Sequence, residues 1–390
     1  MLKPHTLREA TRLTQAGRLT EATALLQRML RGNSESTPSR HLIGLDAAPP
    51  AIDIEANDVG INNRAADSGS PSVAPRRLQP SFNRAKDGTW LGLRGIKHAP
   101  PALTDIAPEA AIFTEGSFSN KAGSRAYKLF VPSGYRGRPL PLVVMLHGCT
   151  QSPDDFAAGT RMNFIAEEQT CMVVYPAQAS DANPSKCWNW FQSAHQRRDD
   201  GEPSLIAGIT RQVMRDYCVD QKRVFVAGLS AGGAAAAIMG ATYSDLYAAI
   251  GVHSGLAYGA ATDMPSAFAA MRQGSGASRC AISGGPTIPS IIFHGDRDTT
   301  VHPDNGVRVV EQVVGITRTR KKMHRGQIPG GHGYTRTTYA DGDREISEHW
   351  TIHGAGHAWS GGSPAGSYTD PEGPDATKEM LRFFLANPHP

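Results

Sequence analysis

The stretch Arg223-Val-Phe-Val-Ala-Gly-Leu-Ser-Ala-Gly-Gly233 decides how the chain is expected to fold. It begins with an apolar run of β-branched and aromatic residues and breaks into Gly-Leu-Ser-Ala-Gly, which fits the pattern G-x-S-x-G. The alanine-rich run after it is typical of a buried helix. Strand, tight turn and helix in this order predict a nucleophile elbow, a turn that raises the hydroxyl of Ser230 above the sheet. Outside that context, the same letters describe only a glycine-rich turn.

Length and charge narrow the class of protein. The 390 residues suffice for one large α/β domain with additional segments. A formal net charge of +4 is small for this length, and it favours neither nucleic acid nor a membrane surface as a partner. No apolar run reaches the roughly 18 residues that a membrane span requires. The first ten residues lack the apolar core of a signal peptide, so no export signal is expected.

The cysteines leave two interpretations open. No two of the five cysteines have C-x-x-C spacing, so neither a zinc site nor a redox motif is expected. An odd number spread over a large domain is typical of buried free thiols. The alternative is one disulfide between Cys149 and Cys187, because both belong to loops predicted near the active site.

The chain divides into three predicted regions. Residues 1–31 form a helical extension, because apolar residues recur at helical spacing on both sides of Gly17 within residues 5–30. Such a hairpin cannot bury its apolar face alone, so it docks on the catalytic domain, on a second subunit or on a partner. Residues 32–105 are rich in Ser, Pro, Gly and Asn and read as a flexible linker. Residues 106–390 form the catalytic domain.

Strands and helices alternate along the catalytic domain, which predicts an α/β fold with a mostly parallel, doubly wound sheet. The strand over residues 127–132 ends at a proline and is expected at the sheet edge. The other strands are expected at residues 141–147, 171–175, 224–227, 248–253, 290–294 and 348–353, and helices at residues 163–169, 205–217 and 375–385.

A reactive serine needs an imidazole to take its proton and a carboxylate to orient that imidazole. The expected order of the three residues in the chain is Ser, Asp, His. Two aspartates follow the strand expected at residues 290–294. Asp298 is favoured, because the loop can turn it toward the site, whereas Asp296 is better placed to hold the turn. His357 follows in a glycine-rich loop, while His353 is still in the last strand. The predicted triad is therefore Ser230, Asp298 and His357.

Two backbone amides are predicted to bind the developing oxyanion. The loop His147-Gly-Cys-Thr-Gln151 follows a central strand, and the Cys149 N–H directly after Gly148 is the first candidate. The Ala231 N–H, at the start of the helix after the elbow, is the second.

Three tryptophans are candidate substrate-binding residues. Trp188 and Trp190 lie in one loop, and Trp359 lies two residues after His357. Each is expected either to wall an acyl-binding cleft or to belong to the core. The basic run over residues 318–325 is expected to be a solvated strand or turn, since no aromatic residues are interleaved with its charges.

Six motifs stand out along the chain: His147-Gly-Cys-Thr-Gln151, Cys187-Trp-Asn-Trp-Phe191, Gly228-Leu-Ser-Ala-Gly-Gly233, His253-Ser-Gly255, His294-Gly295 with Asp298, and Gly356-His-Ala-Trp359. Taken together, they resemble the poly(3-hydroxybutyrate) depolymerase family of esterases, which is related to feruloyl and acetylxylan esterases. The resemblance covers roughly residues 112–386 and implies an α/β-hydrolase fold. It implies hydrolysis of short-chain hydroxyalkanoate esters or a related polyester by the predicted triad, with no cofactor and no metal.

The resemblance leaves substrate and compartment open. A feruloyl or acetylxylan type of carbohydrate esterase is the first alternative, and a non-catalytic hydrolase-like protein that binds a partner through residues 5–30 is the second. Many members of the family are secreted, which implies an extracellular protein, whereas the absence of a visible signal peptide favours the cytoplasm.

Overall fold

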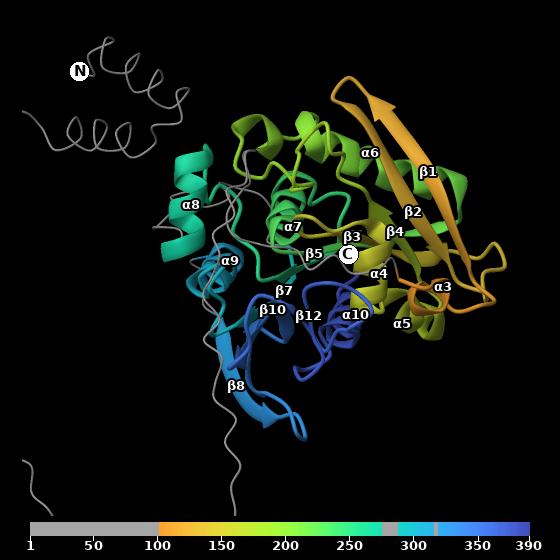
Figure 1. The fold of residues 1–390 in the computed structure, drawn as a ribbon. Helices are drawn as coiled ribbons and strands as arrows, with labels where there is room; N and C mark the ends of the chain where they lie inside the picture. Colours follow the sequence, from red (N-terminus) through yellow and green to blue (C-terminus); the bar gives the residue numbers. More distant parts are fainter. Residues whose placement is uncertain (1–100, 275–287, 316–318) are drawn as a thin grey trace, which may run out of the picture. The chain divides into compact units, whose positions relative to one another are not determined.

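The computed structural model describes residues 101–274, 288–315 and 319–390 (Figure 1). The chain divides into two compact units, residues 1–84 and 85–390, and every described residue belongs to the second unit. The helical hairpin predicted over residues 5–30 lies outside the described residues, so its docking role stays a prediction. Helix α3, Leu103–Ile106, spans the predicted boundary between linker and catalytic domain.

A ten-stranded sheet forms the centre of the described unit, in the order β1-β2-β4-β3-β5-β6-β7-β10-β9-β8. The six strands from β4 to β10 in this order are parallel, and the strands on both outer sides are antiparallel. This is the mostly parallel sheet that the sequence predicts. The strands are β1 Ile112–Asn120, β2 Gly123–Val131, β3 Leu140–Leu146, β4 Met172–Pro176, β5 Val219–Leu229, β6 Ala249–His253, β7 Ser290–Gly295, β8 Arg320–Gln327, β9 Gly333–Asp341 and β10 Arg344–His353. A small parallel pair, β11 Trp359–Ser360 and β12 Thr369–Asp370, lies apart from this sheet.

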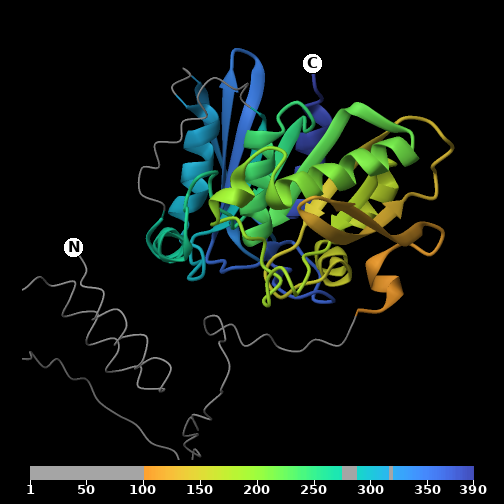
Figure 2. The same cartoon turned by 90° about the horizontal axis from the view of Figure 1, so that it is seen from above.

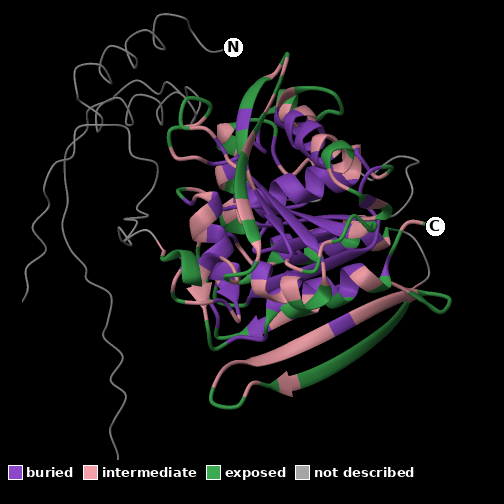
Figure 3. Cartoon of the chain, turned by 90° about the vertical axis from the view of Figure 1, so that its right-hand side faces the viewer, coloured by how far each residue is buried: buried purple, intermediate pink, exposed green. Residues whose placement is uncertain are grey.

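Helices cover both faces of the sheet (Figure 2), because the central strands carry apolar side chains on both sides. One face is packed by α6, α7, α8 and α9, and the other by α3, α4, α5 and α10. Figure 3 shows the resulting continuous buried layer through the middle of the unit. The helices are α4 Pro153–Thr160, α5 Met162–Gln169, the 3-10 helix η1 Ser193–Gln196, α6 Gly201–Asp216, α7 Ala231–Thr242, α8 Met264–Gln273, α9 Asp304–Val314 and α10 Ala376–Ala386.

The sheet edges differ from the prediction. The strand expected at the edge is β2, and its outer side pairs with β1 in an antiparallel ladder. Strand β1 is not predicted from the sequence, because its residues are only exposed or half-buried and its hydrophobic pattern is therefore weak. At the other edge, β8 carries residues 320–325 of the basic run and is exposed along nearly its whole length, as the hairpin at the bottom of Figure 3 shows. The expectation of a solvated strand there is confirmed.

The part of the chain that the structure describes contains neither a membrane-spanning helix nor a cluster of metal ligands. No described helix combines the length and the apolar character needed to cross a bilayer. The described His, Cys, Asp and Glu residues also contain no group of three or more suited to hold a metal ion.

Candidate active site

Ser230 lies on a strained turn between β5 and α7. Its backbone angles, φ 58° and ψ −119°, belong to a region that non-glycine residues rarely occupy. The turn closes only because Gly228 and Gly232, two residues to either side of Ser230, have no side chains. A Cβ atom on Gly228 would lie 2.3 Å from the Gly232 carbonyl, and one on Gly232 would lie 2.0 Å from the Leu146 carbonyl oxygen. This geometry is that of the predicted elbow.

Asp298 and His357 are joined, although 59 residues separate them in the chain. His357 Nδ1 lies 2.7 Å from Asp298 Oδ2, and the two side chains are 10% and 0% exposed. The other oxygen, Oδ1, accepts hydrogen bonds from the amides of Thr300 and Val301 at 2.9 and 2.8 Å. With Nδ1 donating to the carboxylate, His357 Nε2 is left as the ring acceptor, which is the tautomer that a general base requires.

The carboxyl group of Asp298 is held in its charged form. Burial alone would raise the pKa of Asp298, but hydrogen bonds from His294 and His357 outweigh burial and lower this pKa well below its ordinary value. His294 Nε2 also lies 2.9 Å from the carbonyl oxygen of Val301, to which it donates. Asp298 therefore faces two imidazoles as an anion.

Asp296 pairs with a different histidine. Its Oδ2 lies 2.9 Å from His353 Nδ1, and its Oδ1 accepts from the Gly354 amide at 2.7 Å. These side chains are 37% and 46% exposed, unlike the buried pair beside them. Asp296 thus fastens the end of β7 to the end of β10, which matches the turn-holding role expected for it.

His253 lies between the Ser230 turn and the His357 loop. Its carbonyl oxygen accepts from the Ser230 amide at 2.9 Å, and its Nε2 accepts from the Ser360 amide at 3.0 Å. Burial, followed by the charges of His294 and His357, lowers the pKa of His253 well below its ordinary value, so the ring is neutral. Among the described contacts there is no hydrogen bond from the Ser230 hydroxyl to His357. Catalytic hydrogen bonds are often long in ligand-free sites and tighten when substrate binds.

The loop after β3 lies against the Ser230 turn. A Cβ atom on Gly148 would be 3.7 Å from the Cβ of Ser230. The Gly148 amide donates to Gln151 Oε1 at 2.9 Å, whereas no hydrogen bond among the described residues uses the Cys149 amide. The Ala231 amide belongs to the first turn of α7, whose N–H groups have no partner within the helix. Both predicted oxyanion donors therefore lie on segments beside Ser230.

The cysteine alternatives are settled by the geometry. Cys149 and Cys187 form a disulfide, and Cys171 and Cys218 are free. The disulfide ties the loop after β3 to the tryptophan-containing loop.

Of the two interpretations left open for the tryptophans, burial favours the core. Trp188, Trp190 and Trp359 are 0%, 5% and 1% exposed. The indole of Trp188 donates to the His147 carbonyl, and that of Trp359 donates to Thr377 Oγ1. Trp188 therefore holds the start of the loop after β3, and Trp359 ties the segment after His357 to α10.

The family is decided by the match over residues 125–319 to the family model described as esterase PHB depolymerase. That match covers half of the chain. The chain belongs to the PHB depolymerase esterase family. Poly(3-hydroxyalkanoate) depolymerase C of Paucimonas lemoignei is 31% identical over 292 residues, which cover 72% of this chain and 70% of that protein. The probable acetylxylan esterase A of Neosartorya fischeri is 28% identical, over 51% of this chain and 57% of that protein.

One solved esterase structure shares the fold of this chain. An acetyl xylan esterase from Aspergillus awamori superposes with a TM-score of 0.56 at 20% identity, over 70% of this chain and 99% of the other. The fold is therefore that of an α/β-hydrolase, and this PHB depolymerase family member is a carboxylic ester hydrolase.

Four residues around the site carry structural roles that sequence analysis did not assign. Gln151 and His294 are parts of the recognised motifs, but only the structure shows that they bind Gly148 and Asp298. Gln178 and Glu202 lie in segments without any motif. A polar residue next to an apolar strand end is the only signal for Gln178, and it is too common to be informative.

Proposed function

We propose that this esterase hydrolyses short-chain 3-hydroxyalkanoate esters, as oligomers or polymer, through an acyl-enzyme on Ser230. The observation that carries the proposal is the buried Asp298–His357 pair, at the same sheet edge as the strained Ser230 turn. The substrate class follows from family membership and from the depolymerase relative.

In the proposed reaction, Ser230 Oγ attacks the ester carbonyl while His357 Nε2 takes the hydroxyl proton. Asp298 stabilises the imidazolium that forms. The amides of Cys149 and Ala231 donate hydrogen bonds to the tetrahedral oxyanion, and each such donor is worth about 10²–10³ in rate. His357 then protonates the leaving alcohol. Finally it takes a proton from water, which attacks the acyl-enzyme and releases the acid.

A carbohydrate esterase is the second candidate, favoured by the acetylxylan esterase relative and by the solved acetyl xylan esterase. The same residues would act on an acetyl or feruloyl ester of a sugar polymer. Only the groups attached to the ester differ between the two candidates, so the substrate must distinguish them.

The test compares wild type with Ser230→Ala on p-nitrophenyl acetate, butyrate and octanoate, on soluble 3-hydroxybutyrate oligomers, on acetylated xylan and on methyl ferulate. We expect cleavage of the hydroxybutyrate oligomers and a loss of about 10⁶ in kcat in the variant. Serine-dependent cleavage of acetylated xylan or methyl ferulate alone would replace the first candidate by the second. Full activity of Ser230→Ala would refute the acyl-enzyme scheme.

A further inference from the structure

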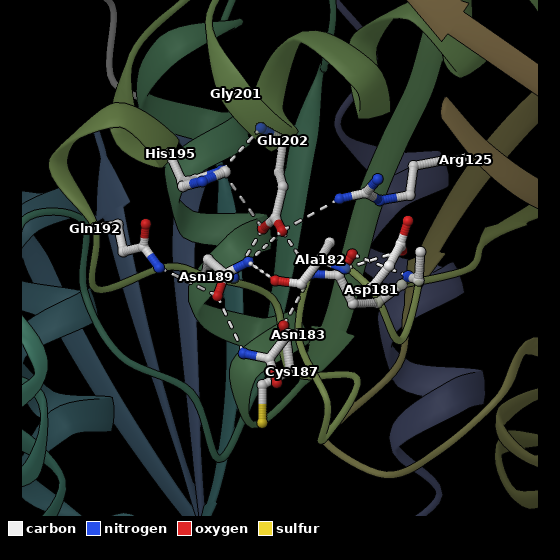
Figure 4. Close-up of polar contacts among 12 residues, drawn as sticks. Arg125, Asp181, Ala182, Asn183, Cys187, Asn189, Gln192, His195, Gly201 and Glu202 are labelled. Carbon is white, nitrogen blue, oxygen red and sulfur yellow. Dashed lines mark hydrogen bonds and ion pairs between the residues drawn. The ribbon is translucent and has the colours of Figure 1, made fainter. Parts of the chain in front are cut away.

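Glu202 is a buried carboxylate that the proposed reaction does not use. It lies in the first turn of α6 with 3% of its surface exposed, surrounded by polar side chains from separate segments (Figure 4). Burying a carboxylate costs several kcal/mol unless its partners compensate. Its contacts therefore indicate what the buried charge achieves.

Both ends of one loop are bound by this carboxylate. Oε2 accepts from the backbone amide of Asn189 at 2.7 Å, and Oε1 accepts from the Asn189 side-chain amide at 2.7 Å (Figure 4). Oε1 also accepts from the side-chain amide of Gln178, at the other end of the loop. The buried guanidinium of Arg125 provides the countercharge, with Nη2 at 3.5 Å. Glu202 thus fixes the loop over residues 178–189 at its first and last residues.

That loop in turn holds the segment that carries the proposed oxyanion donor. Four connections join residues 178–189 to residues 147–150. They are Gln178 N to His147 Nε2 at 3.1 Å, Trp188 Nε1 to the His147 carbonyl at 3.1 Å, Thr150 N to the Ser185 carbonyl at 2.7 Å, and the Cys149–Cys187 disulfide. In addition, Gln178 Nε2 donates to the Cys187 carbonyl at 2.8 Å. The chain of contacts from Glu202 to the Cys149 amide is therefore continuous.

We propose that Glu202 is a positioning residue for the oxyanion hole. Its carboxylate holds the 178–189 loop, and this loop holds the Cys149 amide beside Ser230. Donors aimed at a developing charge are effective only when they are already in place, because reorganising them during the reaction costs free energy. Without Glu202 the disulfide and the three hydrogen bonds still join the two loops, but the first and last residues of the 178–189 loop lose their acceptor on α6, so the joined loops can shift relative to Ser230. The inference rests on the proposed acyl-enzyme function.

The decisive variant is Glu202→Gln. The amide keeps the size of the side chain but replaces one acceptor oxygen by a donor, which then faces the donors of Asn189 and Gln178. We expect kcat per active site to fall by about 10- to 100-fold, because misplacing one oxyanion donor forfeits part of its 10²–10³ contribution. KM should stay within about twofold. Inhibition by a phenylboronic acid, whose serine adduct places an oxygen in the oxyanion hole, should weaken by the same factor as kcat.

Glu348→Gln is the matched control. Glu348 is also fully buried and accepts from Arg336, Arg382 and Trp350, but no hydrogen bond joins it to either loop among the described residues. We expect this variant to be less stable and to keep wild-type kcat per active site, counted by titration with a fluorophosphonate. Gln178→Met is a second probe, because it removes the link to Cys187 and leaves the Glu202–Arg125 pair. It should lower kcat in the same direction as Glu202→Gln.

The outcomes separate the two proposals. Wild-type kcat per active site in Glu202→Gln would overturn the positioning role, and so would an equal loss in Glu348→Gln. If Glu202→Gln does not fold, an unchanged kcat in Gln178→Met overturns it. If the proposed esterase function itself is wrong, the wild type will show no Ser230-dependent ester cleavage.

Discussion

Replacing Asp298 by asparagine removes the charge that faces His357 and keeps the shape of the side chain. The amides of Thr300 and Val301 both donate to Oδ1 at 2.9 and 2.8 Å, so the oxygen of the asparagine keeps that position. Its NH₂ group then faces His357 Nδ1, 2.7 Å away in the native pair. Because NH₂ donates, Nδ1 must accept, and the ring proton moves to Nε2. His357 can then no longer take a proton from the serine hydroxyl.

The expected loss in kcat is about 10⁴-fold, the effect of this tautomer change in a serine protease triad, which corresponds to about 5.5 kcal/mol of activation free energy. Asp296→Asn is the matched control, because Asp296 makes the same kind of contact with His353 on the protein surface. An exposed pair of this kind contributes about 0–1 kcal/mol. We therefore expect kcat of Asp296→Asn to stay within about threefold of wild type.

The assay is kcat for p-nitrophenyl butyrate per titrated active site, with circular dichroism to confirm folding. If Asp298→Asn keeps more than a tenth of the wild-type kcat, the assignment of Asp298 as the orienting carboxylate is wrong. An equal loss in Asp296→Asn would show that the two aspartates act together in holding the loops rather than in separate roles.

Reduction of the Cys149–Cys187 bond should lower the thermal unfolding midpoint, because a link across 38 residues restricts the unfolded chain by about 4 kcal/mol. Calorimetry with and without dithiothreitol tests this, and Cys187→Ser should reproduce the effect. Lowering the pH from 7 to 5 should cost about 2 kcal/mol of unfolding free energy at His147, because burial lowers its pKa to about 4 from 6.5 and the unfolded chain takes up the proton first. This stability is present above pH 6.5 and is lost as the pH falls toward 4; urea titrations should show a smaller loss in His147→Gln. Gly232→Ala should lower the unfolding free energy by roughly 1–3 kcal/mol or more, since the new Cβ would lie 2.0 Å from the Leu146 carbonyl oxygen.

Each of these predictions has a contradicting result. The same unfolding midpoint in the reduced and oxidised protein would contradict a stabilising role for the disulfide. An identical pH dependence of stability in wild type and His147→Gln would remove His147 as its source. Wild-type stability of Gly232→Ala would show that the elbow relaxes more easily than its contacts indicate.

The sequence predicts most reliably the strands whose residues are completely buried. Strands β3 and β4 are buried on both faces, so the sequence itself contains unbroken apolar runs there. Apart from Thr337, the residues of strands β1, β8 and β9 are half-buried or exposed, and they carry no such pattern. The same reasoning explains why the sequence leaves two interpretations open for Trp188 and Trp359. A core and a binding cleft are both apolar, so an aromatic residue in a loop is compatible with either until its neighbours are known.

The sequence by itself determined the class of the fold, the elbow at Ser230 and the order in which the candidate serine, aspartates and histidine occur. The elbow depends on residues next to one another in the chain, the fold class on the succession of local patterns, and the order of the residues is read from the sequence directly. Only the tertiary structure decided that Asp298 pairs with His357 and Asp296 with His353, and that Cys149 is bonded to Cys187. It also placed Glu202 against Gln178, 24 residues away. Such pairings depend on where separate strands end along a common sheet edge, and the register that sets those ends is formed only when the strands pair.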